Sequence, residues 1–253
     1  MDEGAIIDSV RKERGDTRRS APSWPVVAFA WAGACVFVIS LGYFLYAYLV
    51  RFGAGPAGAG LWWPVLGNTA LFTAFALHHS LFARTRVKAW VGHVASPVVE
   101  RSLYTWVASL MFIVVCWQWI LLPGQVYRVE GSWRWIGWFA QAAGLVLTFL
   151  GSRALDVLDL AGVRPVLAAR SAHVPLMTSG VFGFVRHPLY LGWVLFTFGA
   201  PDMTATRAQF AAISALYLAL AIPWEERALV RTFGADYEAY RRKTRWRMLP
   251  GIY

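Results

Sequence analysis

Four long runs of apolar residues decide what this chain can fold into. They are Pro25–Val50, Leu61–Ala83, Leu103–Pro123 and Trp133–Gly151, and the only charged residue in them is Arg134, at the edge of the last run. A helix needs roughly 20 mostly apolar residues to cross the hydrocarbon core of a bilayer. Because backbone polar groups in lipid must be bonded within their own segment, runs of this kind predict membrane-spanning helices.

Two shorter apolar runs follow, Pro188–Pro201 and Ala208–Trp224, joined by the polar stretch Asp202–Arg207. We interpret them as a short helical hairpin whose first arm spans only part of the bilayer. The composition agrees, since 58% of the residues are hydrophobic and 15% charged, whereas soluble domains carry about 25% charged residues. The predicted fold is therefore an all-α integral membrane protein with about six transmembrane helices.

The distribution of basic residues predicts how the chain crosses the membrane. Of 24 Lys and Arg residues, all but Arg51, Arg128, Arg134 and Arg207 fall in the amino-terminal arm, the second and fourth connections or the tail. Basic residues favour the cytoplasmic side, so both termini are predicted to be cytoplasmic, in a bacterial inner membrane. The net charge of +10 then reflects topology and contact with anionic lipid. No nucleic-acid-binding motif accompanies the charge.

The two cysteines and the tryptophans have simple interpretations. Cys35 and Cys116 lie in separate predicted spans, which indicates neither a disulfide framework nor a metal site. Many of the 14 tryptophans lie near the ends of apolar runs: Trp24, Trp62, Trp63, Trp133, Trp135 and Trp224. Their rings favour the headgroup level of a bilayer, so we expect an interfacial belt.

The first candidate site is the loop Leu176–His187, which leads directly into an apolar helix at Pro188. Proline fits the first turn of a helix, where its missing N–H costs little. A helix start leaves N–H groups free to bind an anion, and Arg186 and His187 lie at that point. The alternative is an interfacial anchor, with Arg186 directed at lipid headgroups.

The second candidate site is the acidic pair Glu225 and Glu226, which we expect to end the last apolar helix. Acidic groups are unfavourable at a helix carboxyl end, and ionisable residues at membrane depth usually mark function. They would suit a ligand with ammonium and hydroxyl groups, although a charged stop to the span remains an alternative. The hairpin brings both candidate sites to the same end of two neighbouring helices.

The tail forms the third part of the predicted site. Apolar and aromatic residues recur at helical spacing, interrupted by Gly234: Leu229, Val230, Phe233, Tyr237 and Tyr240. This pattern predicts a carboxy-terminal amphipathic helix that lies in the membrane interface or folds over a pocket.

The motifs of this region carry a resemblance. The segments Arg186–Gly192, Glu225–Leu229 and Phe233–Arg241 resemble the carboxy-terminal region of the isoprenylcysteine carboxyl methyltransferase and phospholipid methyltransferase superfamily. The match runs from Leu176 to Pro250, with order and spacing intact.

Upstream motifs are similar to the NnrU-like branch of that superfamily, which includes bacterial methanethiol S-methyltransferases. They are His79–Arg84, Glu100–Tyr104, Trp117–Trp119 and Pro201–Thr204. After the fourth span the branch typically has the stretch His-Phe-Asp-Leu-Phe-Gly-Leu-Arg. Here Asp159, Gly162 and Arg164 are kept, but the histidine is replaced by Val157, which bears on the acceptor rather than on the cofactor.

The resemblance implies S-adenosylmethionine as cofactor, with no metal. The cofactor-binding residues that it implies are Leu176, Thr178, Gly180, Arg186, His187, Pro188, Tyr190, Gly192, Glu225, Glu226, Tyr237, Tyr240 and Arg241. No catalytic side chain is assigned. Arg84, Arg101 and Asp159 are candidate substrate-binding residues, although interfacial packing, or pairing of Asp159 with Arg153 or Arg164, explains them equally well.

The predicted organisation has three parts: a cytoplasmic arm (1–24), a four-helix transmembrane region (25–151) and a cofactor-binding methyltransferase region (152–253). The function that follows is methyl transfer to a small thiol, a prenylcysteine carboxylate or a lipid amine, by an in-line reaction in which positioning supplies most of the acceleration. Two alternatives stay open. One is a membrane NADPH-dependent reductase, and the other is a non-enzymatic NnrU-like membrane factor.

Overall fold

The computed structural model of the chain describes residues 22–55, 62–82, 97–168 and 175–253. This part is mainly helical, as predicted. Most of the predicted arm and the candidate substrate residue Arg84 lie outside the described residues.

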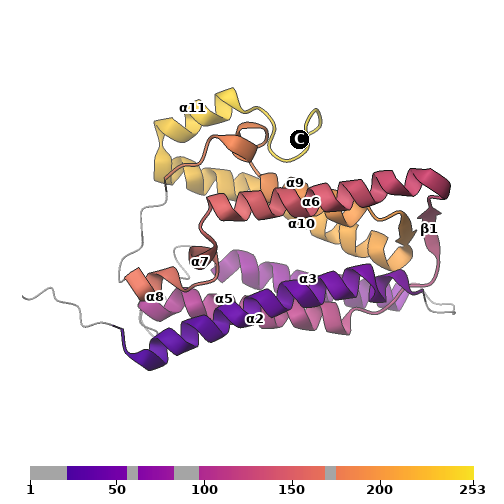
Figure 1. The fold of residues 1–253 in the computed structure, drawn as a ribbon, viewed down its shortest axis with the longest axis horizontal. Helices are drawn as coiled ribbons and strands as arrows, with labels where there is room; N and C mark the ends of the chain where they lie inside the picture. The colour runs from indigo at the N-terminus through magenta and orange to yellow at the C-terminus, as the bar shows by residue number, and fades with distance from the viewer. Residues whose placement is uncertain (1–21, 56–61, 83–96, 169–174) are drawn as a thin grey trace, which may run out of the picture.

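One group of helices consists of α2 (Trp24–Leu49), α3 (Trp62–Phe82) and α5 (Pro97–Gln118), which lie along one another in the lower part of Figure 1. Aromatic side chains fill the core between these helices and the second group. Phe44 of α2 stacks on Trp193, with ring centroids 4.6 Å apart, and also packs against Phe112 and Phe210. The aromatic core therefore joins both halves of the sequence.

The second group consists of α6 (Arg134–Ala154), α9 (Pro188–Phe198) and α10 (Ala205–Phe233), above the first group in Figure 1. Glycines let α6 and α9 pack backbone against backbone. A Cβ on Gly144 would lie 2.5 Å from the carbonyl oxygen of Gly192, and one on Gly137 would lie 2.6 Å from that of Gly199. Small residues at such contacts are typical of helix packing in membranes.

A short antiparallel ribbon closes one end of the molecule, at the right of Figure 1. It pairs β1 (Gln125–Arg128) with β2 (Asp202–Thr204), next to η1 (Arg51–Gly53) and η2 (Gly131–Trp133). Arg207 donates to the backbone carbonyls of Tyr48, Leu49 and Asp202, while the Asp202 carboxylate pairs with Arg128 and Arg134. The four basic residues predicted on the non-cytoplasmic side thus all lie at this end.

The opposite end carries α7 (Val157–Leu160), α8 (Arg164–Ala168), η3 (Gly180–Gly183) and α11 (Ala235–Lys243). The carboxy-terminal segment after α11 folds back toward the start of α9. Backbone hydrogen bonds run from Arg186 N to Trp246 O and from His187 N to Arg247 O. The tail is therefore part of the structure around the first candidate site.

In the part of the chain that the structure describes, four helical segments are long and apolar enough to cross a membrane: Trp24–Gly53, Val99–Gln118, Gly131–Ala154 and Ala205–Phe233. They correspond to the predicted first, third, fourth and last spans. Helix α3 is not among them, and α9 is a shorter apolar helix, so six spans remain a prediction. The six tryptophans named above are all exposed, from 52% for Trp224 to 81% for Trp62, as residues facing lipid would be.

Helix α10 differs from the expectation that Glu225 and Glu226 end it. The helix continues to Phe233 because Leu229, Val230 and Phe233 pack into an apolar cluster with Phe182 and Tyr237. It ends where Gly234 adopts a φ of 54°, a conformation that glycine adopts without steric cost. The expected amphipathic tail is therefore two helices, α10 and α11, with the glutamates inside the first.

Pro223, inside α10, has no N–H to donate to the carbonyl of Ala219, four residues earlier. The hydroxyl of Tyr253 donates to that carbonyl instead, at 3.2 Å. Tyr253 thus replaces the backbone hydrogen bond that Pro223 cannot make, just before Glu225 and Glu226.

Candidate functional site

Arg186 and Glu226 bring the two predicted motifs into direct contact. The Nε of Arg186 lies 2.6 Å from Oε1 of Glu226, with only 5% and 3% of the two side chains exposed. Arg186 precedes α9 and Glu226 lies inside α10, so the ion pair joins the hairpin arms at one end. The two motifs were predicted to meet around a shared cavity. The Arg186–Glu226 ion pair instead fills the space between these two residues.

The carboxy-terminal segment completes the surroundings of this ion pair. Nη1 of Arg186 donates to the carbonyls of Thr244 and Arg245, at 2.7 and 2.8 Å. Nε of Arg247 lies 3.4 Å from Oε2 of Glu226, and its guanidinium group lies over the Tyr253 ring. Arg186 therefore holds the tail, α9 and α10 together.

His187 lies between the two carboxylates. Its Nδ1 is 3.6 Å from Oε2 of Glu225, and its Nε2 is 3.6 Å from Oε1 of Glu226. Both distances exceed a hydrogen bond, and the buried Nε2 has no hydrogen-bond partner among the described residues. Nε2 is buried and faces the Glu226 carboxylate, so the imidazole ring is held between the two acidic side chains.

Glu225 is the accessible carboxylate of the pair. Its side chain is 43% exposed, and it accepts a short hydrogen bond from the hydroxyl of Tyr190. The ring of Tyr190 stacks on His187, with centroids 5.3 Å apart. Glu225, Tyr190 and His187 therefore form one polar surface, whose orientation the buried Arg186–Glu226 pair fixes.

Pro188 begins α9, as predicted, with His187 at the capping position. The side chain of His187 makes no capping hydrogen bond, and its backbone N–H is taken by Arg247. Part of the expected anion site at this helix start is therefore occupied by the tail.

The tail aromatics pack against the loop before α9. Tyr237 and Tyr240 are almost fully buried in a cluster that includes Leu176 and Phe182. Tyr240 donates to the carbonyl of Phe182 at 2.7 Å, and burial raises the pKa of its hydroxyl to about 12. Burial also raises the pKa of Tyr237, whose hydroxyl has no hydrogen-bond partner among the described residues.

Other predicted cofactor residues do not join this group. Thr178 and Gly180 are exposed in the loop. Arg241 is exposed and pairs with Glu238. A Cβ on Gly192 would lie 2.4 Å from Oγ1 of Thr148, so the structure places this glycine in the α6–α9 contact.

The candidate substrate residues Arg101 and Asp159 pair with each other. Nη2 of Arg101 lies 3.4 Å from Oδ2 of Asp159, whereas the sequence favoured Arg153 or Arg164 as partner. Arg164 pairs with Asp156 instead, and its hydrogen bond lowers the pKa of that carboxyl group.

Gly162 lies in the same stretch, where its backbone touches α5. A Cβ there would meet Cα of Ser102 at 2.9 Å, and its carbonyl accepts from the Ser102 hydroxyl at 2.6 Å. The Asp-x-x-Gly-x-Arg pattern at 159–164 thus packs the turn between α7 and α8 against α5.

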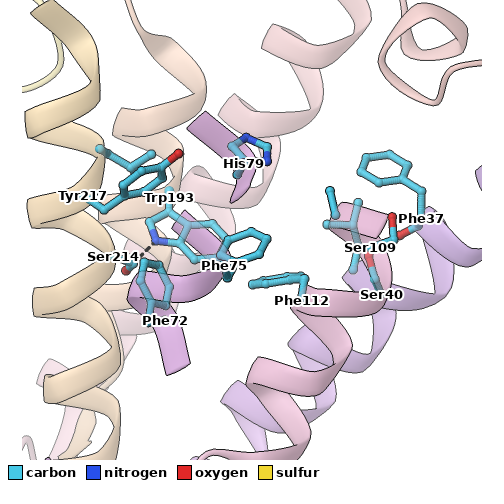
Figure 2. A pocket seen from close by; sticks show the side chains of 13 residues that line it. Phe37, Ser40, Phe72, Phe75, His79, Ser109, Phe112, Trp193, Ser214 and Tyr217 are labelled. Atoms are coloured by element: carbon cyan, nitrogen blue, oxygen red, sulfur yellow. Dashed lines mark hydrogen bonds between the residues drawn. The ribbon is translucent and has the colours of Figure 1, made fainter. Parts of the chain in front are cut away.

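A cavity of about 220 Å³ lies deeper in the molecule, between α2, α3, α5, α9 and α10. Figure 2 shows its aromatic walls, with Trp193 donating to Ser214. The residues that line it are Phe37, Ser40, Leu41, Phe72, Phe75, His79, Ala108, Ser109, Phe112, Trp193, Ser214, Tyr217 and Leu218. Not one of these described residues is Asp, Glu, Lys or Arg.

Tyrosines connect this cavity with the polar surface around Glu225. The hydroxyl of Tyr190 donates to Glu225. Tyr217 lines the cavity and lies eight residues before Glu225, on the same side of α10. Trp193, also in the cavity wall, follows Tyr190 by three residues on α9.

Sequence reasoning missed the cavity and most of its lining, including Trp193 and Tyr217. An available signal was their spacing from Tyr190 and Glu225, since residues three, four or eight apart share one helix face. It also missed the tail residues Arg247 and Tyr253, for which no local pattern gives a signal.

Comparisons with known proteins agree with this arrangement. The model of the isoprenylcysteine carboxyl methyltransferase family matches residues 164–231. This range includes Arg186, His187 and both glutamates. No solved structure matches the chain.

Several curated proteins resemble a larger part of the chain. Methanethiol S-methyltransferase 1 of Bradyrhizobium diazoefficiens is 35% identical over 184 residues, 71% of this chain and 65% of the relative. Methanethiol S-methyltransferase of Pseudomonas deceptionensis is 32% identical over 202 residues, 74% of each chain. Nurim of Xenopus laevis is 29% identical, over 60% of this chain and 58% of its own length. The chain spans slightly less than two thirds of the first of these relatives.

The methanethiol S-methyltransferases thus match over more than two thirds of the chain, whereas the family model covers the segment that holds the polar surface. The chain belongs to the superfamily of membrane methyltransferases that includes the isoprenylcysteine carboxyl methyltransferases and the bacterial methanethiol S-methyltransferases.

Proposed function

We propose that this protein is an integral membrane methyltransferase that uses S-adenosylmethionine to methylate a small, neutral thiol. One observation carries the proposal. Trp193, in the wall of the uncharged aromatic cavity, lies three residues along α9 from Tyr190, which forms a polar surface with Glu225 and His187, in a chain whose family transfers methyl groups. The cavity suits the acceptor, and the polar surface suits the methyl donor.

The residues of the polar surface fit the donor. S-Adenosylmethionine carries an ammonium group and ribose hydroxyls. A half-exposed carboxylate such as Glu225 can accept hydrogen bonds from these donors. Tyr190, which donates to Glu225, and His187, whose Nδ1 faces it, are the other polar groups of this surface. Arg186 and Glu226 already satisfy each other, so we assign them to holding this surface in shape.

The donor supplies an electrophilic methyl group on a positively charged sulfur. The chain has to align an acceptor with that methyl group and exclude water from it. Trp193, Phe112 and Phe72 form a rigid apolar wall, and alignment of reacting atoms at about 3–3.5 Å supplies much of the acceleration in such reactions.

The lining of the cavity favours a neutral acceptor over a charged one. Burying an ionised carboxylate or ammonium without a partner costs several kcal/mol, and the described lining residues offer no counter-ion. A prenylcysteine carboxylate or a lipid amine would need one. A small thiol can enter the cavity in its uncharged form. This agrees with the thiol named as acceptor in the methanethiol S-methyltransferases.

Two alternative functions have weaker support. An NADPH-dependent reductase would need cationic groups for an extra phosphate, and the Arg186 and Arg247 side chains are already directed at Glu226. A non-enzymatic membrane factor fits the nurim relatives, whose names state no activity. It gives no reason for an accessible Glu225 carboxylate that Tyr190 and His187 hold in place.

The proposal is tested by ligand binding to the purified protein in detergent. We expect micromolar affinity for S-adenosylhomocysteine, the demethylated product, and no measurable affinity for NADPH. Preference for NADPH would favour the reductase, and binding of neither ligand would favour the non-enzymatic factor. We also expect the donor to enter from the cytoplasm, since the polar surface lies at the end of the molecule whose connections hold most basic residues.

A further inference from the structure

Among the described residues of the cavity wall, His79 is the one with an imidazole ring, whose unprotonated nitrogen is a proton acceptor. It lies near the end of α3, and Figure 2 shows its ring at the same end of the cavity as the Tyr217 hydroxyl. Serine and tyrosine hydroxyls, the other polar groups of the lining, are poor bases. An acceptor that must lose a proton therefore has a single candidate partner in this wall.

Tyr104 fixes the ring of His79. The Tyr104 hydroxyl lies 2.9 Å from Nδ1 of His79 and 3.2 Å from the backbone carbonyl oxygen of the same residue. A hydroxyl group has a single proton. When that proton is donated to the carbonyl, the tyrosine oxygen accepts from Nδ1–H, and the lone pair of the imidazole is then on Nε2.

His79 contacts Tyr104 through Nδ1, which leaves Nε2 as the ring nitrogen for a molecule in the cavity. The neighbouring His78 differs in its surroundings. Its ring stacks on Phe82, with centroids 4.5 Å apart, and on Tyr104 at 6.1 Å, but it does not line the cavity. The two adjacent histidines therefore offer a direct comparison within the same helix.

We propose that His79 is the general base of the reaction, accepting the proton of a thiol held in the cavity, and that Tyr104 is a positioning residue that fixes the His79 tautomer. The inference rests on the proposed function. The S–H proton moves to Nε2 of His79, the freed electron pair of the acceptor sulfur forms the new bond to the methyl carbon, and the bond from that carbon to the donor sulfur breaks. The products are a neutral thioether, S-adenosylhomocysteine and protonated His79, which returns its proton to water.

Proton transfer from a thiol is needed because the thiolate is the nucleophile, and a positioned base typically contributes about 10²–10⁴-fold. A neighbouring histidine activates thiols in the same way in cysteine-dependent enzymes. The neutral cavity admits the thiol in its uncharged form and ionises it only beside the donor.

The test compares His79→Gln with the matched control His78→Gln, using methanethiol as acceptor. For His79→Gln we expect kcat/KM at neutral pH to fall at least about 100-fold and to recover as the pH approaches the pKa of the free thiol. With a more acidic acceptor, a fluorinated ethanethiol, kcat/KM of His79→Gln should fall much less. His78→Gln should keep the activity and the pH profile of the natural protein.

A second readout does not depend on turnover. In protein labelled with ¹⁵N-histidine, nuclear magnetic resonance should show His79 with a protonated Nδ1 and an unprotonated Nε2, and Tyr104→Phe should lose this tautomer preference. Tyr104→Phe should lower kcat/KM about tenfold, with partial recovery at higher pH, so it decides the question if His79→Gln does not fold.

The outcomes separate the two proposals. If the natural protein methylates the thiol while His79→Gln and His78→Gln behave alike, or Tyr104→Phe leaves the pH profile unchanged, the role of His79 is overturned and the methyltransferase stands. If the natural protein binds no S-adenosylhomocysteine, the proposed function itself fails.

Discussion

Arg186 and Glu226, separated by 40 residues in the sequence, form a buried ion pair in which Nε lies 2.6 Å from Oε1. The same guanidinium group holds the backbone of Thr244 and Arg245. One side chain therefore connects the start of α9, the interior of α10 and the carboxy-terminal segment. The adjacent Glu225 remains accessible, so the two neighbouring glutamates have different tasks.

Glu226→Ala should destabilise the protein. Removing one partner of a buried ion pair leaves the other charge buried alone, which costs about 3–5 kcal/mol. We expect the melting midpoint in detergent to fall by about 6 °C or more. Glu238→Ala, which removes the exposed pair with Arg241, should change stability by no more than about 1 kcal/mol. Equal effects of the two changes would contradict the structural role of Glu226.

Glu225→Gln should weaken cofactor binding while leaving stability almost unchanged. The substitution removes a charged acceptor worth about 1.5–3 kcal/mol to a hydrogen-bonded ligand, so the Kd for S-adenosylhomocysteine should rise by about tenfold or more. Isothermal titration would measure it. Arg128→Ala, at the other end of the molecule with 61% of its side chain exposed, is the control. An unchanged Kd in the Glu225 variant would remove this carboxylate from the site.

Gly192→Ala should loosen the contact between α6 and α9. The added Cβ would lie 2.4 Å from Oγ1 of Thr148 and 2.7 Å from the carbonyl oxygen of Gly144, and overpacking of this kind typically costs about 1–3 kcal/mol. Gly42→Ala, where nothing lies within 4 Å of the added atom, is the matched control. Thermal melting of the two variants checks the prediction, which fails if Gly192→Ala is as stable as Gly42→Ala.

Ala108→Phe should block the acceptor cavity. Ala108 lines the cavity, whereas Leu110, two residues later on the same helix, is 47% exposed. We expect kcat/KM for methanethiol to fall at least about tenfold in Ala108→Phe, while the Kd for S-adenosylhomocysteine stays within about twofold. Leu110→Phe should leave both unchanged. Full activity of Ala108→Phe would show that the acceptor binds elsewhere.

Much of the fold could be predicted because lipid imposes simple rules. Uncharged runs near Pro25–Val50 and Leu103–Pro123 form helices, and Pro188 begins a helix where its ring is tolerated. The meeting of Arg186 with Glu226 was predicted from the hairpin alone. The helices were predicted from residues close together in the sequence, and the meeting of Arg186 with Glu226 from the short connection between two neighbouring helices.

The remaining features depend on contacts between distant segments. The glutamates were expected to stop α10, but burial of Leu229 and Phe233 against the loop carries the helix further. Asp159 pairs with Arg101, 58 residues away, rather than with a local arginine. The cavity is lined from five helices, and a transmembrane helix that is apolar all round gives no sign of which face lines it.

The most direct measurement of the central claim is transfer of a labelled methyl group from S-adenosylmethionine by the purified protein, with methanethiol, a prenylcysteine and a phospholipid amine as competing acceptors. We predict labelled dimethyl sulfide as the main product, formed at a rate that follows the methanethiol concentration. Label appearing in the prenylcysteine or the lipid, and none in the thiol, would contradict the account of an uncharged cavity built for a small neutral acceptor.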